Sequence, residues 1–150
     1  MTLPYKPTKY IEEVHAYIDG CSKGNPGPAA IGIIITDAEG RIIKSYKEYI
    51  GEATNQTAEY LALEKALDLA ISCTTNKVMI FSDSRLVIKQ MRKEFRIKAH
   101  HLLEIHKRIR NAERMFKEVI YTYASRESEL VKEADKLSDL AIQQLKIKPK

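Results

Sequence analysis

The chain has 150 residues, of which 44% are hydrophobic and 30% are charged, values typical of one folded globular domain and not of a wholly disordered chain. Only two cysteines are present, which excludes a disulfide framework, and the longest nearly apolar run, residues 29–36, is far shorter than the roughly 20 residues that span a membrane. The net charge of +5 is uneven: residues 85–117 hold eleven Lys and Arg against three Glu, a balance of +8.

The first half of the chain predicts a loose leader, three strands and a helix. Residues 1–13 are predicted to be a flexible leader. Runs rich in β-branched residues predict strands at residues 14–18, 29–36 and 41–49, separated by turn sequences rich in Gly, Pro, Asn and Asp. Thr54 or Asn55 can cap a helix whose apolar residues recur at helical spacing up to residue 70.

The second half alternates strands and helices. It predicts strands at residues 78–81 and 118–123 and helices at residues 86–92, 101–115 and 130–145, followed by a basic tail at residues 146–150. Ser84 can cap the first of these helices. The order is therefore βββαβααβα within one domain, residues 14–145. Short turns make the first three strands antiparallel, and helical crossovers make the later strands parallel to the first. We expect an α/β fold with a five-stranded mixed sheet flanked by helices.

Four acidic residues stand where solvation alone does not explain them. Asp19 and Asp83 each follow an apolar strand, so neighbouring parallel strands would bring both carboxylates to one edge of the sheet. Glu59 lies in the first turn of the first helix, and Asp135 lies inside the last helix. Gathered carboxylates repel one another, and a hard divalent cation such as Mg²⁺ or Mn²⁺ relieves that repulsion. Taken singly, each acid is better explained as a turn former or a helix cap, and only the spacing of all four along the βββαβααβα chain favours a catalytic site.

Four motifs in this order resemble the ribonuclease H type 1 family over about residues 14–141. They are YIDGCSKGNPGP at residues 17–28, TNQTAEY at 54–60, SDS at 82–84 and EADKL at 133–137. The resemblance implies a ribonuclease H-like fold and an endoribonuclease that cuts the RNA strand of RNA–DNA hybrids, leaving 5′-phosphate and 3′-hydroxyl ends. It also implies that two Mg²⁺ ions, with Mn²⁺ as an alternative, are held by Asp19, Glu59, Asp83 and Asp135.

The same resemblance implies the residues that touch substrate. Asn25 and Thr54 match positions that contact phosphates of the DNA strand, and Asn55 and Gln56 match contacts in the minor groove. The first turn after the catalytic strand would follow the RNA backbone, which adds four candidates: Gly20, Cys21, Ser22 and Lys23. Recognition of the RNA strand depends on its 2′-hydroxyl, which DNA lacks.

Three departures from the family pattern affect these expectations. The loop at residues 124–129 has no His, and Arg126 is the candidate to stabilise charge there, since arginine stays protonated and cannot act as a base; an exposed loop arginine is the alternative. Val131 stands where many members carry Asn. Residues 91–100 are too short for the family's basic handle, which identifies a handle-free subtype. Its basic candidates for gripping substrate are Arg85, Lys89, Arg92, Lys93, Arg96 and Lys98.

Two other functions remain open at this point. One is a related polynucleotidyl nuclease that also cuts double-stranded RNA, and the other is a hybrid-binding module without catalysis. All four acids are present, which favours the enzyme, because degenerate copies usually lose one. With no secretory signal in the sequence, we expect a monomer in the cytoplasm that does not bind membranes, with Cys21 and Cys73 not joined by a disulfide.

Overall fold

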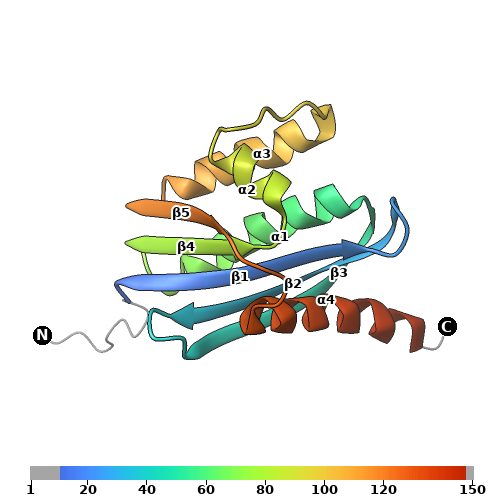
Figure 1. Cartoon of the computed structure of the whole chain (residues 1–150), viewed down its shortest axis with the longest axis horizontal. Coiled ribbons are helices and arrows are strands. Elements are labelled where there is room, and N and C mark those ends of the chain that lie inside the picture. Colours follow the sequence, from blue (N-terminus) through green and yellow to red (C-terminus); the bar gives the residue numbers. More distant parts are fainter. Residues whose placement is uncertain (1–10, 148–150) are drawn as a thin grey trace, which may run out of the picture.

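The structure, a computed structural model, describes residues 11–147 (Figure 1). Its elements are β1 (Glu13–Ser22), β2 (Gly27–Asp37), β3 (Ile42–Ala53), α1 (Asn55–Ala70), β4 (Lys77–Ser82), α2 (Arg85–Met91), α3 (His100–Glu113), β5 (Glu118–Tyr123) and α4 (Glu129–Ile147). The predicted order βββαβααβα is thereby confirmed. The predicted leader (1–13) and tail (146–150) fall mainly outside the described residues, and that division of the chain stays a prediction.

The five strands form one sheet in the order β3-β2-β1-β4-β5. The meander β1-β2-β3 is antiparallel, whereas β4 and β5 run parallel to β1, as the helical crossovers require. The predicted fold class, an α/β fold with a five-stranded mixed sheet flanked by helices, is confirmed. In the described part of the chain, no helix is long and apolar enough to cross a membrane.

Helices α1 and α4 cover opposite faces of the sheet (Figure 1). Successive side chains of a strand point to opposite faces, so Gly20 faces α1 while Asp19 and its cross-strand partner Gly32 face α4. The main hydrophobic core lies on the α1 side, where Tyr60 and Leu63 of that helix are fully buried. Side chains from α1 on one face and from α4 on the other can therefore approach this part of β1.

Helices α1 and α2 begin at the predicted caps. The Thr54 hydroxyl accepts the backbone N–H of Thr57 at 3.1 Å at the start of α1, and the Ser84 hydroxyl accepts that of Val87 at 3.2 Å at the start of α2. Each cap satisfies one of the backbone donors that a helix leaves unpaired in its first turn. The starts of α1 and α2, which flank the edge where Asp19 and Asp83 lie, are thus fixed locally.

The strand β1 is longer than the sequence predicts. We expected it to end near residue 18, but it continues to Ser22, because antiparallel pairing with β2 extends to the pair Ser22 and Ala29. Pairing with β4 stops earlier, at Tyr17 and Phe81. Asp19 therefore lies inside β1, two residues beyond the point where pairing with the neighbouring strand β4 ends.

Candidate active site

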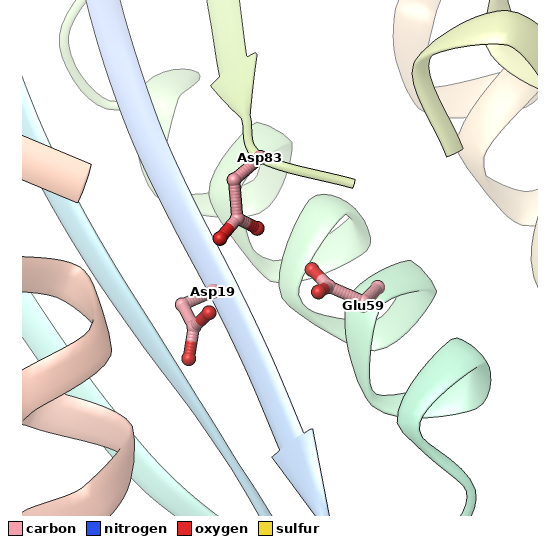
Figure 2. A group of neighbouring side chains, drawn as sticks. All are labelled: Asp19, Glu59 and Asp83. Atoms are coloured by element: carbon pink, nitrogen blue, oxygen red, sulfur yellow. The ribbon is translucent and has the colours of Figure 1, made fainter. Parts of the chain in front are cut away.

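Three of the predicted acids come together at this edge of the sheet. Asp19, Glu59 and Asp83 each offer a carboxylate oxygen, and these oxygens all lie within 4.8 Å of one another. Figure 2 shows them pointing toward a common space from β1, from α1 and from the residue after β4. Asp19 and Asp83 each stand two residues beyond the last β1–β4 pair, Tyr17 and Phe81, so the parallel register aligns them.

Gly20 brings Glu59 to the other two acids. A Cβ atom at Gly20 would lie 2.3 Å from the carbonyl carbon of Ala58, a distance that no side chain tolerates. The absence of a side chain lets the first turn of α1 contact the backbone of β1 directly. The backbone of Gly20 also acts on the Glu59 carboxyl, where it lowers the pKa of that group.

The Glu59 carboxylate is the strongest electrostatic anomaly of the site. Burial, followed by the negative charges of Asp19 and Asp83, raises its pKa well above the ordinary value of 4.5, although the Gly20 backbone and Arg126 act in the opposite direction. Its Oε1 atom is buried and has no hydrogen-bond partner among the described residues. A buried carboxylate oxygen that lacks a donor and faces two further carboxylates fits a hard divalent cation, which prefers oxygen ligands.

Asp19 is the centre of the cluster. It is 6% exposed, and this burial raises the pKa of its carboxyl from 3.8 to about 7, with further contributions from the negative charges of Asp135 and Asp83. A hydrogen bond from the buried Ser138 hydroxyl, at 2.6 Å, acts in the opposite direction. Asp19 therefore interacts with acids from both faces of the sheet.

Asp135, the fourth predicted acid, lies beside the other three and is not among the acids within 4.8 Å of one another. It is exposed on α4, and its pKa is raised by partial burial and by the negative charge of Asp139, while hydrogen bonding with Asp19 lowers it. The approach of α4 depends on Gly32, because a Cβ atom there would lie 2.1 Å from the carbonyl oxygen of Ala134. Two close helix–strand contacts, at Gly20 and Gly32, therefore bring the acids together.

Arg126 reaches the cluster from the loop between β5 and α4. Its Nε donates to Oδ2 of Asp83 at 3.2 Å, and 82% of its side chain is exposed. The guanidinium group thus lies at the open side of the acidic cluster. Val131, the departure from the family pattern in the following helix, is 1% exposed, so its apolar side chain packs inside the protein.

A hydrogen-bonded link joins the β1–β2 turn to the start of α1. The Asn25 Oδ1 atom accepts the backbone N–H of Asn55 at 2.9 Å, and the Asn55 Oδ1 atom accepts that of Ser22 at 2.9 Å. The Ser22 hydroxyl also donates to the carbonyl of Ala53 at 2.8 Å. Three predicted substrate-binding residues are therefore held in one rigid arrangement on the surface.

The other predicted substrate residues lie around this link and along the neighbouring helices. Thr54 caps α1, and the amide nitrogen of Gln56 lies 3.4 Å from Oε1 of the buried Gln90 on α2. The Lys23 ammonium donates to Oδ1 of Asp139 at 3.1 Å. The Arg85 guanidinium lies over the ring of Tyr123, 4.0 Å from its centre.

The two cysteines are both free thiols. Cys21 is half-buried next to the acidic cluster, with its Sγ 4.0 Å from Oδ1 of Asp139, and burial raises the pKa of its thiol. Cys73 is buried just after α1.

Two residues of the site were not predicted from the sequence. Ser138 contacts Asp19, and Asp139 contacts Lys23 and Cys21. Both lie on α4, in the turn that follows Asp135. A signal was available for Ser138: it is a polar residue on the buried side of an amphipathic helix, three residues after Asp135.

Comparisons with known proteins agree with this geometry. A family model described as "Reverse transcriptase-like" matches residues 17–141. A curated ribonuclease HI of Halobacterium salinarum is 46% identical over 78 residues, which are 52% of this chain and 39% of that protein. The chain thus spans less than half the length of curated relatives such as this one.

Solved structures of two RNase H1 proteins match over nearly their whole length. The crystal structure of RNase H1 from Halobacterium salinarum has a TM-score of 0.83 and 35% sequence identity, covering 88% of this chain and 98% of that one. LC11-RNase H1, solved in complex with an RNA/DNA hybrid, has a TM-score of 0.81 and 32% identity, again covering 88% of this chain and 98% of that one. With its family motifs, its sheet order and its cluster of acids, this chain belongs to the ribonuclease H type 1 family.

Proposed function

We propose that the protein is an endoribonuclease that hydrolyses the RNA strand of RNA–DNA hybrids and leaves 5′-phosphate and 3′-hydroxyl ends. The observation that carries the proposal is the cluster of Asp19, Glu59 and Asp83, whose carboxylate oxygens lie within 4.8 Å of one another. The cluster lies at an open edge of the sheet, in a chain of this family. The hybrid bound by the similar LC11-RNase H1 supports the choice of substrate.

We propose that the cluster holds divalent cations, two Mg²⁺ ions in the cell, with Mn²⁺ able to replace them. Asp19, Glu59 and Asp83 would be ligands, and Asp135 would complete the set from α4. The buried, unpartnered Oε1 of Glu59 supports this assignment, since a cation gives that oxygen the partner that the described residues do not. Bound there, the ions would supply the Lewis acidity that activates water and neutralises charge on the scissile phosphate.

The chain's own residues then have separate tasks. The carboxylates keep their spacing because each belongs to a different element that is fixed by backbone contacts. Arg126 stays protonated, so it cannot take up a proton from water, but it can stabilise negative charge on a phosphate or on a departing product. Its ion pair with Asp83 would keep the exposed guanidinium at the mouth of the cluster before substrate binds.

The link between the β1–β2 turn and α1 is suited to holding phosphates and sugars. The amide oxygens of Asn25 and Asn55 both accept backbone N–H groups, which leaves the NH₂ group of each side chain to donate to substrate. We propose that Asn25 and Thr54 contact the DNA strand, and that Asn55 and Gln56 lie in the minor groove. The backbone of residues 20–23, beside Asp19, would follow the RNA strand.

We propose that α2 and the segment after it take the place of a basic handle. Residues 92–99 join α2 directly to α3 and contain no further helix. Arg85 and Lys89 are held over the aromatic rings of Tyr123 and Phe95, at 4.0 and 5.0 Å from the ring centres. Side chains held in this way lose less conformational freedom when they bind a phosphate. Helix α2 can therefore contribute to substrate binding although it is short.

We further propose that the protein acts as a monomer in the cytoplasm. The acids of the candidate site all come from one chain, so no second copy is needed to complete it. The two free cysteines are consistent with a reducing compartment.

The test is cleavage of an end-labelled RNA strand annealed to DNA, with Mg²⁺, with Mn²⁺ and with EDTA. We expect cuts inside the RNA strand that depend on the metal and leave 3′-hydroxyl ends. Double-stranded RNA of the same sequence serves as a second substrate, and cutting of it would extend the substrate range. Binding of the hybrid without cleavage in either metal would contradict the proposal and identify a binding module.

A further inference from the structure

Ser138 is a fully buried polar residue in contact with two parts of the acidic cluster. Its side chain is 0% exposed, and its hydroxyl oxygen lies 2.6 Å from Oδ2 of Asp19 and 2.9 Å from the backbone carbonyl oxygen of Asp135. The first contact joins residues 119 positions apart in the sequence, and the second lies within α4. Ser138 thus connects the central acid on β1 to the helix that carries the fourth acid.

The hydroxyl of Ser138 has one proton for these two acceptors. An ionised carboxylate is a better acceptor than a peptide carbonyl, and O–H···O⁻ hydrogen bonds are typically about 2.5–2.7 Å long. The 2.6 Å contact with Asp19 fits that range, whereas the 2.9 Å contact with the Asp135 carbonyl is typical of a serine that contacts its own helix. The proton therefore belongs to the Asp19 carboxylate when that group is charged.

We infer that Ser138 is a positioning residue that orients the Asp19 carboxylate for cation binding and keeps Asp135 at a fixed distance from it. The inference rests on the function proposed above. Ser138 holds Oδ2, so rotation of the carboxylate is restricted and its remaining lone pairs face a fixed direction. Hydrogen-bond partners behind a metal ligand commonly contribute about 10- to 100-fold to metal affinity or activity.

The position of Ser138 depends on the same close contact that brings in Asp135. The backbone nitrogen of Ser138 would lie 2.9 Å from a Cβ atom placed on Gly32, the cross-strand partner of Asp19. Because Gly32 has no side chain, this turn of α4 lies directly against β2, and the short serine side chain can reach Asp19. An alanine at position 138 fits the same space, favours the helix and removes only the hydroxyl.

A matched control exists in the same chain. Ser72, just after α1, is exposed and donates to the carbonyl of Leu69 three residues earlier, at 2.8 Å. The Ser138 hydroxyl has the equivalent contact with the carbonyl of Asp135, three residues earlier, but it also contacts Asp19, which takes its proton. The variants Ser138→Ala and Ser72→Ala therefore both remove a hydroxyl that contacts a backbone carbonyl three residues earlier, but only the first removes a hydrogen bond to a carboxylate of the acidic cluster.

The experiment measures two values. The first is the dissociation constant for Mn²⁺ without substrate, by calorimetry, and the second is the Mn²⁺ concentration that gives half-maximal cleavage of a hybrid. We expect Ser138→Ala to raise both values about tenfold or more, with cooperative unfolding retained, and Ser72→Ala to leave both unchanged. Ser138→Thr, which keeps the hydroxyl, should stay closer to wild type than Ser138→Ala.

Wild-type values for Ser138→Ala would overturn the inference, because the serine would then serve only to pack the helix. A loss in Ser138→Thr as large as that in Ser138→Ala would have the same meaning. If the wild-type protein itself neither binds Mn²⁺ nor cleaves hybrid, the proposed function fails, and this result is distinct from a failure of the Ser138 inference alone.

Discussion

Replacing Asp19 with Asn removes a buried negative charge from the acidic cluster and keeps the shape of the side chain. The Asn oxygen can still accept the hydroxyl proton of Ser138, so the contact with α4 is retained. Without metal, we expect the Asp19→Asn variant to be more stable than the wild-type protein at neutral and alkaline pH. Its hydrolytic activity should nevertheless be lost, because the central ligand is gone.

The magnitude follows from the pKa of Asp19. The difference between its ordinary value of 3.8 and about 7 in the folded protein corresponds to about 4 kcal/mol. A carboxyl whose pKa is raised by folding costs nothing below about pH 4, when it is protonated in both states. The cost grows between about pH 4 and 7 and is constant above that, so the advantage of Asn should rise over the same window to at most about 4 kcal/mol.

Urea unfolding of both proteins in EDTA, at several pH values from 4 to 8.5, measures this difference directly. Adding Mg²⁺ should raise the melting temperature of the wild-type protein more than that of Asp19→Asn, because only the former keeps all its carboxylates. The reasoning is refuted if the difference in unfolding free energy between the two proteins does not change with pH. A variant that is less stable than wild type throughout would lead to the same conclusion.

Three further predictions concern the approach of α4, the exposed arginine and the basic segment. Gly32→Ala should lower the unfolding free energy by about 2 kcal/mol or more and reduce activity, because the added methyl group would collide with the Ala134 carbonyl. Urea unfolding and cleavage assays test this, and an unchanged unfolding free energy would contradict it. Arg126→Ala should lower kcat about tenfold and change the free energy of unfolding by less than about 1 kcal/mol. Arg41→Ala, which also removes an exposed ion pair, is the control and should leave kcat unchanged. Equal kcat values for the two variants would argue against a role for Arg126. Arg85→Ala should weaken hybrid binding and make the plot of log Kd against log salt less steep by about 1, and an unchanged slope would exclude a phosphate contact.

The fold could be predicted from the sequence because local signals agreed with one another. β-Branched runs, turn residues and the caps Thr54 and Ser84 each predicted an element that the structure contains. The end of β1 could not be predicted, because its last residues are in a strand only through pairing with β2. Such pairing depends on a partner distant in the sequence, which local patterns do not report.

The meeting of three of the four acids could be predicted for a similar reason, while their role in catalysis stays a prediction. Asp19 lies inside β1 and Asp83 directly follows β4, but both come two residues after the last β1–β4 pair, so the parallel register aligns them, and Glu59 lies beside them. The position of Ser138 on the buried side of an amphipathic helix indicates a buried partner, but the sequence does not show that this partner is Asp19 on β1. Asp139 was missed likewise, since its partners Lys23 and Cys21 are more than a hundred residues away.

The contacts at Gly20 and Gly32 have a consequence for how the protein can change over evolutionary time. At both positions helix backbone meets strand backbone, so the separation of the acids does not depend on the size of any core side chain. Substitutions among the buried aliphatic residues can therefore accumulate and alter stability while the spacing of the carboxylates is preserved. At the two glycines, by contrast, every substitution would be harmful, because even a methyl group would displace a helix together with the acid that it carries.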